Sequence, residues 1–596
     1  MLVLGFNWPS FHDNAVAAIL DGRLVYASEE ERYTRHKHAP YELPINAMAH
    51  CLKFLERKYG MKPDTIDAFA INFDPKFYSA KSRAWHSFSQ NALIKDWMLR
   101  SDAGYDAYSF MLKGMRGSIA SGFDFTKSAK EFVRMAALSI GRSINKEVKI
   151  IPVRHHLAHA ASAYYFSGKS SATCIVVDGQ GETDATTAWS IKDGEFEELL
   201  RVGWKEGSLG YLYESVSKRL GFGRLEGPGK VMGLAPYGKI DVKALGRLES
   251  LFDLEVGDAP YRIKKIAKAQ SHDLMYDKIA EVFTGAKRGA SPGPGEFPGK
   301  KAADTARTLQ VFFERLYSGV AEWTANNSGM NDIVIAGGSA LNAKANMEMH
   351  YSKKFRSVFV FPAAGDAGTA IGAAAYAYEN VIGEKMRRER IKDLYLGDGY
   401  DAEQVKAAVA ASNLKAEMIG EEMGQIAELL RVSKVIGFYQ GRQEFGPRAL
   451  GNRSIIGNPT SKKNWKRINS IKGREAWRPL APSVLASSMN EYFADAEEHE
   501  FMVMMYMAKS EAAKRIPAVV HIDGTARPQA VRADRNKLWH GLIKEFGEAS
   551  GENVIVNTSF NIAGEPIVDT PVQAIRSFAA SGLDALYLDG WLISKH

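Results

Sequence analysis

Cysteine is almost absent from this sequence: Cys51 and Cys174 are the only two among 596 residues, and they lie far apart. Two distant cysteines provide neither a disulfide framework nor a cysteine-based zinc site, and they favour a reducing compartment. The first residues, MLVLGFN, carry neither the basic segment of a secretory signal nor a long apolar span. We therefore expect a cytoplasmic protein without a membrane anchor.

The rest of the composition is that of an ordinary globular protein, with 45% hydrophobic and 24% charged residues. A chain of 596 residues exceeds what one hydrophobic core usually supports, so at least two domains are expected. The formal net charge of +8 favours anionic partners. Charge alone does not distinguish nucleic acid from phosphorylated small molecules.

Two histidines four residues apart form the most informative motif. His155 and His159 open the small-residue segment HHLAHAASAYYF, and their spacing places both imidazoles on one face of a predicted helix. A predicted strand then ends at Asp178, and a second acid, Asp366, follows the short apolar strand SVFVF. Two imidazoles and two carboxylates with open coordination positions are typical of a catalytic metal site. The alternative is that these histidines, with His156, cap the helix or are hydrogen-bonded core groups.

A layout of strands and turns occurs twice in the first half of the chain. In each copy a strand and a polar loop precede a hairpin, whose turn is Asp21-Gly22 in the first copy and Asp193-Gly194 in the second. Asp-Gly between apolar runs is a strong signal for a two-residue hairpin. The predicted strands span residues 2–6, 14–20, 23–28, 173–178, 185–191 and 195–202.

Two related α/β halves that begin with such hairpins form the plan of actin, hexokinase and the heat-shock ATPases. Glycine turns suit nucleotide binding in this plan, because backbone N–H groups without a neighbouring Cβ can approach phosphate oxygens closely. The candidates are Gly179 and Gly181 after one strand, and Gly337 and Gly338 before a predicted helix. Each pair taken alone is equally compatible with a simple tight turn. The small-residue segment 367–378 is predicted to be a helix that packs very close to a sheet or a ligand.

The character of the sequence changes near 385–400, where a polar stretch interrupts the periodic pattern. Residues 441–478 then contain ten Lys and Arg but only two Glu. Four of these cations read as a solvated helix face: Lys462, Lys463, Lys466 and Arg467. Five others lie beside Gly, Pro or Trp at predicted turns, where fixed side chains can bind phosphate or carboxylate groups: Arg442, Arg448, Arg453, Lys472 and Arg478.

Further anion-binding candidates lie toward the C-terminus. Arg527 falls in the turn IDGTARPQAV, and the strand ENVIVN ends in Asn557, Thr558 and Ser559, which offer polar groups for a phosphate or oxyanion. Two segments, 80–130 and 257–303, look like insertions. We expect them to cover an acceptor pocket, although plain surface helices and a loop fit them equally well.

The motifs resemble those of one family, the O-carbamoyltransferases of nodulation-factor and antibiotic biosynthesis, over nearly the whole chain. The N-terminal part is also similar to metal-dependent tRNA threonylcarbamoyl transferases, and the C-terminal part is similar in fold to threonylcarbamoyl-adenylate synthases. The motifs are FHDNAVAAILDG, EEERYTRHKHAPYELP, HHLAHAASAYYFSG, VVDGQGETDATT, EGPGKVMGLAPYG, AGGSALNAKAN, FPAAGDAGTAIGAA, GRQEFGPRALGNRSI, WRPLAPSV and VNTSFNIAGEPIV.

The resemblance implies an α/β fold with a duplicated actin-like (ribonuclease H-like) ATPase domain at 1–390. An α+β domain of the threonylcarbamoyl-adenylate-synthase kind is expected at 391–596. It also implies a two-step reaction, in which the second domain converts carbamoyl phosphate and ATP, used with Mg, into carbamoyl adenylate. The first domain then transfers the carbamoyl group to a hydroxyl of a small-molecule acceptor in natural product biosynthesis. Because a released acyl adenylate is hydrolysed, the intermediate is expected to pass internally between the sites.

The resemblance also implies roles for individual residues. His12 matches the catalytic histidine, and an imidazole with an ordinary pKa near 6.5 suits removal of a hydroxyl proton. The alternative for His12 is a hydrogen-bond anchor in its loop. The family implies iron at the metal site, although the donor set alone also suits Zn(II) or Mn(II). Lys230 and Asn342 are further candidates for nucleotide contact. The matches to the metal ligands are His155, His159, Asp178 and Asp366, and those to the carbamoyl-phosphate site are Arg448, Lys472, Arg478, Arg527 and Ser559.

Two other classes stay open at this point. The basic charge also fits a tRNA-modifying threonylcarbamoyl transferase, but we find no compact RNA-binding motif and expect no nucleic-acid partner. A non-catalytic actin-like ATP-binding protein would need neither His12 nor the basic second domain. The sequence does not fix the stoichiometry and leaves a homodimer open.

Overall fold

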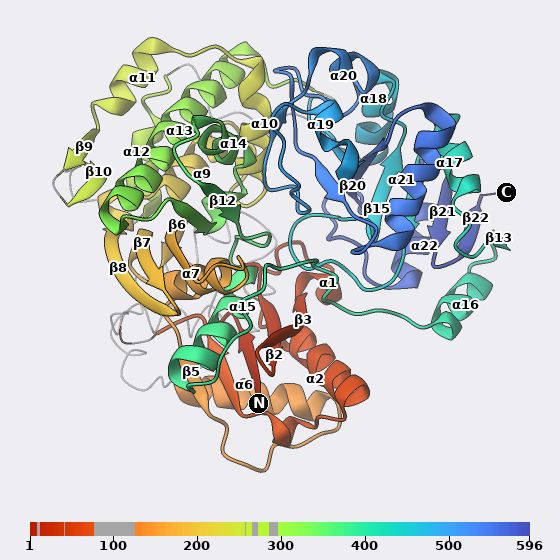
Figure 1. Cartoon of the computed structure of the whole chain (residues 1–596), viewed down its shortest axis with the longest axis horizontal. Coiled ribbons are helices and arrows are strands. Elements are labelled where there is room, and N and C mark those ends of the chain that lie inside the picture. The colour runs from red at the N-terminus through yellow and green to blue at the C-terminus, as the bar shows by residue number, and fades with distance from the viewer. Residues whose placement is uncertain are drawn as a thin grey trace.

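Three sheets of five or more strands organise the part of the chain that the computed structural model describes, residues 1–8, 12–40, 42–74, 76, 125–256, 258–264, 272–284 and 296–595. Two five-stranded sheets belong to the first part of the chain and an eight-stranded sheet to the last part. Figure 1 shows the last part, in blue, beside both halves of the first.

The first sheet has the order β3-β2-β1-β4-β5. β1 runs antiparallel to β2 and parallel to β4, so only the first three strands form a meander. The predicted Asp21-Gly22 turn joins β2 to β3 with φ of 48° and 72°, as a type I′ turn requires. The strands are β1 (Leu2–Phe6), β2 (Ala15–Leu20), β3 (Arg23–Glu29), β4 (Ala68–Ile71) and β5 (Ile150–Pro152).

The second sheet repeats this arrangement. Its order, β8-β7-β6-β11-β12, and its strand directions match those of the first sheet, and Asp193-Gly194 forms the corresponding turn with φ of 50° and 92°. The duplicated actin-like plan predicted from the sequence is therefore confirmed. The strands are β6 (Ser171–Gly181), β7 (Asp184–Lys192), β8 (Glu195–Gly203), β11 (Asp332–Ala336) and β12 (Ser357–Val360).

One local detail differs from the prediction. β6 continues through Gly179 to Gly181, which pairs with Asp184, so the expected glycine loop is reduced to a turn at Glu182 and Thr183. Gly181 is required there by close packing, because a Cβ on it would lie 2.4 Å from Cδ2 of His155.

Two small-residue helices, α7 (His155–Tyr165) and α15 (Ala367–Tyr376), lie between the sheets (Figure 1). Their packing depends on glycine: a Cβ on Gly372 would lie 1.7 Å from the carbonyl oxygen of Ala158, and one on Gly5 would lie 2.0 Å from that of Ala370. The predicted close-packing helix is thus confirmed, although α15 ends at Tyr376 and a π-helical turn, η5 (Ala377–Val381), follows.

Further helices, and the strand pair β9 and β10, surround the two sheets. On the first half they are α1 (Glu31–Thr34), α2 (Ile45–Tyr59), η1 (Pro63–Thr65) and α6 (Phe125–Ser139). The second half carries α8 (Trp204–Gly207), α9 (Leu209–Arg219), α10 (Gly227–Leu234), η3 (Ala235–Tyr237), α11 (Val242–Glu249), β9 (Phe252–Val256), β10 (Ala259–Ile263), α12 (His272–Ala280), α13 (Lys300–Ser328), η4 (Gly338–Leu341) and α14 (Ala343–Ser352).

The last part of the chain forms a mixed sheet of order β13-β22-β21-β14-β15-β20-β16-β19 with helices on it, as predicted for an α+β domain. The strands of this sheet are β13 (Lys415–Met418), β14 (Ile436–Tyr439), β15 (Arg453–Gly457), β16 (Ala481–Leu485), β19 (Gln529–Val531), β20 (Val554–Ser559), β21 (Ala585–Leu588) and β22 (Trp591–Ser594). A separate pair consists of β17 (Tyr506–Met507) and β18 (Thr525–Ala526). The helices of this last part are α16 (Ala402–Ala411), α17 (Gly424–Arg431), α18 (Lys462–Ile471), η6 (Ala486–Ser488), α19 (Met489–Tyr492), α20 (Ser510–Arg515), α21 (Lys537–Ser550) and α22 (Pro571–Ala579).

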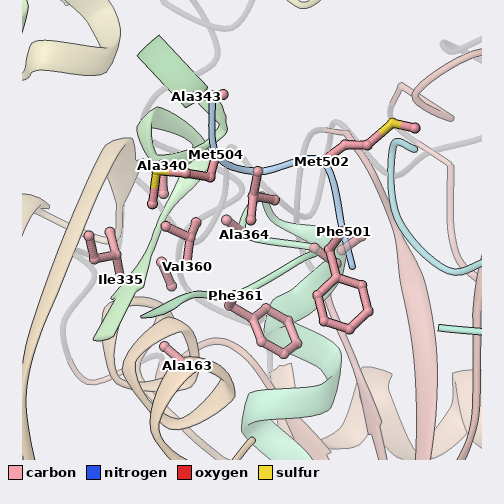
Figure 2. Close-up of a cluster of buried hydrophobic side chains, with 14 of the residues drawn as sticks. Ala163, Ile335, Ala340, Ala343, Val360, Phe361, Ala364, Phe501, Met502 and Met504 are labelled. Carbon is pink, nitrogen blue, oxygen red and sulfur yellow. The ribbon is translucent and has the colours of Figure 1, made fainter. Parts of the chain in front are cut away.

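One apolar core continues from the second half of the first part into the last part. Figure 2 shows Met504 beside Ala340 and Phe501 beside Phe361. The same segment is fixed by hydrogen bonds, since Asn346 Nδ2 donates to the carbonyl of Val503 at 2.8 Å. The two parts therefore pack together as one body along this strip.

The stretch 385–400, predicted as a domain boundary, contains no helix or named strand. It runs along the first sheet, where the backbone N–H of Ala27 donates to the carbonyl of Leu396 at 3.1 Å. Of the two predicted insertions, residues 80–124, 257, 265–271 and 285–295 lie outside the described residues. The described part of 257–303 contains β10, α12 and the start of α13. Among the helices that the structure does describe, none is long and apolar enough to cross a membrane.

Candidate active sites

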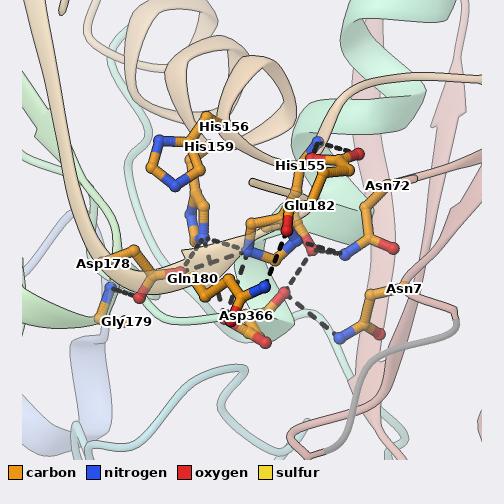
Figure 3. A network of polar contacts seen from close by, with 12 residues as sticks. Asn7, Asn72, His155, His156, His159, Asp178, Gly179, Gln180, Glu182 and Asp366 are labelled. Atoms are coloured by element: carbon orange, nitrogen blue, oxygen red, sulfur yellow. Dashed lines mark hydrogen bonds and ion pairs between the residues drawn. The ribbon is translucent and has the colours of Figure 1, made fainter. Parts of the chain in front are cut away.

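The four predicted metal ligands come together where the two sheets meet. His155 and His159 occupy the first turns of α7, Asp178 lies on β6, and Asp366 directly precedes α15 (Figure 3). The four ligand atoms lie within 4.8 Å of one another. The two Nε2 atoms are 3.1 Å apart, and that of His155 is 3.3 Å from Asp178 Oδ2 and 3.6 Å from Asp366 Oδ1.

The charges in this cluster compensate one another. Burial disfavours a charged His155 ring, but the carboxylates of Asp366 and Asp178 outweigh it and raise the pKa of His155 well above its usual range. Burial by itself would raise the pKa of Asp178. The bonds of Asp178 to both histidines outweigh burial and hold its pKa well below the usual range. Two imidazole nitrogens and two carboxylate oxygens that converge in a buried place fit a divalent transition metal.

Neighbouring side chains hold these ligands in place. The Asn72 amide lies 3.1 Å from His155 Nδ1 and 2.8 Å from Thr369 Oγ1. Glu182 accepts the backbone N–H of His155 at the start of α7, where a carboxylate is favoured by the helix dipole. The pKa of Glu182 is raised to about 7, because the effect of burial exceeds the opposing effect of the His155 charge. Gly338 N–H binds the second oxygen of Asp178 at 3.0 Å.

His12 lies in the loop between β1 and β2, with its Nδ1 2.9 Å from Asp13 Oδ2. Asn7 ties this loop to the metal-ligand cluster, because its amide donates to the carbonyl of Asp13 and also to that of Asp366. Figure 3 shows the bond to Asp366. Burial opposes a charged His12 ring, but the bond to Asp13 and the charge of Asp366 raise the pKa of His12 to about 10. The ordinary value assumed from the sequence therefore does not apply in this structure. A cation held by the aspartates would offset their charge and lower the pKa of His12 again.

The residues predicted to contact nucleotide have mixed environments. Gly337, with φ of 90°, and Gly338 form the turn after β11, beside Asp178. Asn342 instead caps α14 through Ala345 N–H and pairs with Gln310. Lys230 forms an ion pair with Glu475 of the last part of the chain at 2.7 Å. Lys230 thus bridges the two parts, and neither its ammonium nor the Asn342 amide is without a partner.

The predicted carbamoyl-phosphate residues also come together, in the last part of the chain. Lys472 follows α18, and its ammonium reaches the carbonyl and the hydroxyl of Ser559 at the end of β20. The charges of Arg448, Arg478 and Arg527 act on one another. One cluster therefore holds all five predicted residues: Arg448, Lys472, Arg478, Arg527 and Ser559.

Unlike the first cluster, this one consists of like charges. Burial, followed by repulsion from Arg478, lowers the pKa of Arg448 to about 10. Burial and repulsion from neighbouring cations likewise lower the pKa of Lys472 and that of Arg527 well below their usual ranges. Buried charges are stable only when they are paired. The carboxylate of Glu475 lies 3.5 Å from Arg478, but it is also shared with Lys230.

The structure adds residues that the sequence did not single out. Arg474 belongs to the cation cluster, since burial and the charge of Arg478 lower its pKa well below the usual range. Asn561 accepts from Lys472 at 3.0 Å. The sequence signal for Arg474 was its place between Lys472 and Arg478. Two arginines that the sequence grouped with this cluster have another role. Arg442 and Arg453 donate to backbone carbonyls, among them those of Gly397 and Gln440, so they stabilise turns and are not members of the cation cluster.

Taken together, the fold and the two clusters describe a two-part α/β protein with four converging metal-ligand residues in one part and a group of cations in the other. Family models identify the class further. The model described as "Carbamoyltransferase N-terminus" matches residues 3–375, and that described as "Carbamoyltransferase C-terminus" matches residues 427–595. The chain belongs to the carbamoyltransferase family and is an enzyme of that class.

Individual relatives agree with this family. The chain is 32% identical to nodulation protein NolNO of Sinorhizobium fredii over 98% of this chain and 79% of that protein. It is 25% identical to the 3'-hydroxymethylcephem-O-carbamoyltransferase of Streptomyces clavuligerus over 97% of this chain and 96% of that protein. A crystal structure of full-length HypF in its phosphate- and nucleotide-bound form covers 65% of this chain and 56% of its own, at 12% identity and a TM-score of 0.32.

Proposed function

We propose that the enzyme is an ATP-dependent O-carbamoyltransferase with two catalytic parts, residues 1–390 and 391–596. The observation that carries the proposal is the cluster of buried and half-buried cations in the second part. Arg448, Lys472, Arg474 and Arg527 all have lowered pKa values because burial and mutual repulsion disfavour their charges. Carbamoyl phosphate and ATP are polyanions that would supply the missing counter-charge.

In this proposal, the second part makes carbamoyl adenylate. Water splits carbamoyl phosphate into carbamate and phosphate, and a carbamate oxygen then attacks the α-phosphorus of ATP with loss of pyrophosphate. The fixed guanidinium groups of Arg448, Arg478 and Arg527 would hold the phosphate oxygens, since an arginine fork matches two of them at once. Lys472 and Ser559, already in contact, would complete this site.

The first part would then transfer the carbamoyl group. The hydroxyl oxygen of a small-molecule acceptor attacks the carbamoyl carbon, the bond to the AMP oxygen breaks, and the hydroxyl proton goes to His12. A metal ion, Fe(II) by family resemblance, would be held by His155, His159, Asp178 and Asp366 and would polarise the carbamoyl group or a phosphate oxygen. Gly338 lies beside this cluster and would face the nucleotide, whereas the bonds of Asn342 and Lys230 leave them in structural roles.

One segment connects the two sites and supports internal passage of the intermediate. His38 contacts Asp13 beside His12, whereas the nearby Lys37 acts electrostatically on Lys472 of the cation cluster. Arg35 donates to the carbonyl of Ile567, close to Asn561 in sequence, at 2.7 Å. The free, buried thiols of Cys51 and Cys174 fit the reducing cytoplasm that the proposal assumes.

The relatives support a small-molecule acceptor. One of them is named for its action on a 3'-hydroxymethylcephem. We therefore propose a hydroxyl of a secondary metabolite as the acceptor in this enzyme. Membership in a family of transferases gives no support to a non-catalytic ATP-binding protein.

A mass-spectrometric assay for carbamoyl adenylate tests the scheme. Purified enzyme receives ATP, Mg, carbamoyl phosphate and Fe(II) without acceptor, and wild type is compared with Arg478→Ala and His155→Ala. We expect the adenylate from wild type and His155→Ala but not from Arg478→Ala. Arg467→Ala serves as a matched control, because Arg467 pairs with Asp584 outside the cluster. If folded, ATP-binding wild type makes no adenylate, the role given to the second part is wrong.

A further inference from the structure

One carboxylate in the His12 loop lies between two imidazoles. Asp13 Oδ2 is 2.9 Å from His12 Nδ1, and Asp13 Oδ1 is 2.7 Å from Nδ1 of His38, which precedes the α2 region in sequence. An ionised carboxylate only accepts hydrogen bonds, so both rings present Nδ1–H to Asp13. When the ring of His12 is neutral, its lone pair is consequently on Nε2, the atom that points away from Asp13.

The backbone holds this arrangement at some conformational cost. Asp13 N–H donates to the carbonyl of His38 at 2.7 Å, which locks the two loops together. Asp13, His38 and Ala39 have φ of 54°, 65° and 40°, values that non-glycine residues seldom adopt. Strained positions of this kind persist where surrounding contacts over-determine them, and they cluster at functional sites.

Other contacts fix both ends of the pair. The carbonyl of Asp13 accepts a hydrogen bond from the Asn7 amide, which also donates to the carbonyl of Asp366. The position of the loop is thereby fixed relative to a predicted metal ligand. On the other side, Glu31 accepts the backbone N–H of His38. Asp13 therefore cannot turn without breaking bonds to its own loop, at Asn7 and His12, and to His38 in the second loop. About a third of the His12 side chain, 34%, remains exposed, which leaves its ring accessible to a substrate.

We propose that Asp13 and His38 are positioning residues for His12. Asp13 fixes the Nδ1–H tautomer and the ring orientation of His12, and His38 fixes Asp13 by occupying its second oxygen. The inference deepens the proposed function and rests on His12 as the base of the transfer step. There the acceptor hydroxyl proton moves to His12 Nε2, and the resulting imidazolium keeps its Nδ1–H bond to an Asp13 that stays ionised. His38 holds Asp13 and touches no reacting atom.

Rates of carbamoyl loss from enzyme-made carbamoyl adenylate test this proposal, with water and 3'-hydroxymethylcephem as the two acceptors. Removing the base in His12→Ala should slow the step about 100-fold or more. Asp13→Asn should slow it about 10-fold or more in the wild-type background, yet change nothing further in a His12→Ala background. A merely structural role of Asp13 would instead lower the rate by the same factor in both backgrounds, and that result would overturn the proposal.

His38 has a matched pair of variants. Asn and Gly both tolerate a positive φ, but only Asn keeps a donor at the place of Nδ1. We expect His38→Gly to slow the step about 3-fold or more and His38→Asn to restore most of this loss. Equal losses in the two variants would show that the donor does not matter and would remove His38 from the proposal. Adenylate formation, measured in parallel, should be the same in all variants.

Nitrogen NMR of histidine-labelled, metal-free enzyme separates this proposal from the proposed function. Spectra are recorded above the raised pKa of His12, where its ring is neutral. The His12 signals, identified by their loss in His12→Ala, should then show protonated Nδ1 in wild type, and Asp13→Asn should remove that preference. A His12 ring protonated on Nε2 alone in wild type would sink the positioning role, whatever the rates are. If the NMR result is as expected but His12→Ala transfers at the wild-type rate, the base assigned under the proposed function is wrong, whereas the hydrogen-bonded geometry stands.

Discussion

The two candidate sites satisfy their buried charges in different ways. In the first part of the chain, His155 and His159 face Asp178 and Asp366, so the cluster combines imidazoles with carboxylates. In the second part, arginines and a lysine face each other, and their pKa values are lowered. Under the proposed function, the first cluster would exchange its internal contacts for a cation. The second would lose unfavourable free energy on binding a polyanion.

The largest effect is expected when one member of the cation cluster is made apolar. Arg527→Met should lower carbamoyl-phosphate-dependent exchange of pyrophosphate into ATP about 100-fold or more, because a fixed counter-charge for phosphate is lost. The same change should raise the free energy of unfolding of the ligand-free enzyme by about 1 kcal/mol or more, because a buried, repelled charge is removed. Arg467→Met should leave the exchange rate unchanged. Wild-type exchange of pyrophosphate into ATP by Arg527→Met would contradict the role given to the cation cluster and hence its difference from the metal-ligand cluster.

The metal site is tested by two histidines on one helix. His159→Ala removes one ligand, and metal content measured by mass spectrometry should fall from about one to below about one-tenth per chain. His156 is buried beside it but bonds Thr187 at 3.0 Å, so His156→Asn should keep the metal. Equal metal loss in both variants would mean that packing of α7, and not ligation, sets the metal content.

Two glycines of β6 test how tightly the first cluster is packed. A Cβ on Gly181 would lie 2.4 Å from the His155 ring, whereas one on Gly179 would lie 3.3 Å from Tyr211. Gly181→Ala should therefore displace His155 and weaken metal binding about 10-fold or more, with little change in Gly179→Ala. Metal titration of both variants measures this difference. A stronger loss in Gly179→Ala would contradict the packing described for β6 and α7.

The smallest expected effect is a difference in the sign of proton linkage. The pKa of His155 is raised, so its ring holds a proton in the metal-free protein and must release it when Nε2 binds a metal. The pKa of Lys472 is lowered, and a bound polyanion raises it, so pyrophosphate binding should take up protons between that lowered pKa and the ordinary value near 10.5. Calorimetry in buffers of different ionisation enthalpy measures the number of protons released or taken up on binding of the metal and of pyrophosphate. Proton uptake with both the metal and pyrophosphate would show that the two sites do not differ in this way.

Much of this arrangement was predictable from local sequence. Asp21-Gly22 and Asp193-Gly194 specify tight turns because their backbones adopt positive φ, so the repeated hairpins were visible without a structure. His155 and His159 share a helix face by their spacing alone. The predicted strand that ends at Asp178 also indicated that this acid lies near the helix. The position of Asp366 beside them depends instead on the packing of α15 on α7, which local sequence does not specify.

Partners that are distant in sequence could not be predicted. Lys230 lies beside glycines, as a phosphate ligand would, yet its partner is Glu475 of the other part of the chain. Asn342 follows a Gly-Gly turn, but its place at the start of α14 gives it a capping role. Arg453 looked like Arg448, but its guanidinium lies over the Tyr439 ring, 3.6 Å from its centre, and binds carbonyls. Which carbonyls and rings surround an arginine depends on tertiary packing that sequence spacing does not encode.

The order of synthesis gives Arg32 a further meaning. This side chain is 1% exposed and bonds Glu29 and Glu31 beside it, but its remaining partner is the carbonyl of Gly446. Domains generally fold as they leave the ribosome, first the N-terminal ones. Here the buried Arg32 side chain lacks its hydrogen bond to Gly446 until that residue, some four hundred positions later, has been synthesised. We therefore expect the first half to stay incompletely packed during translation and to become native only when the C-terminal part docks.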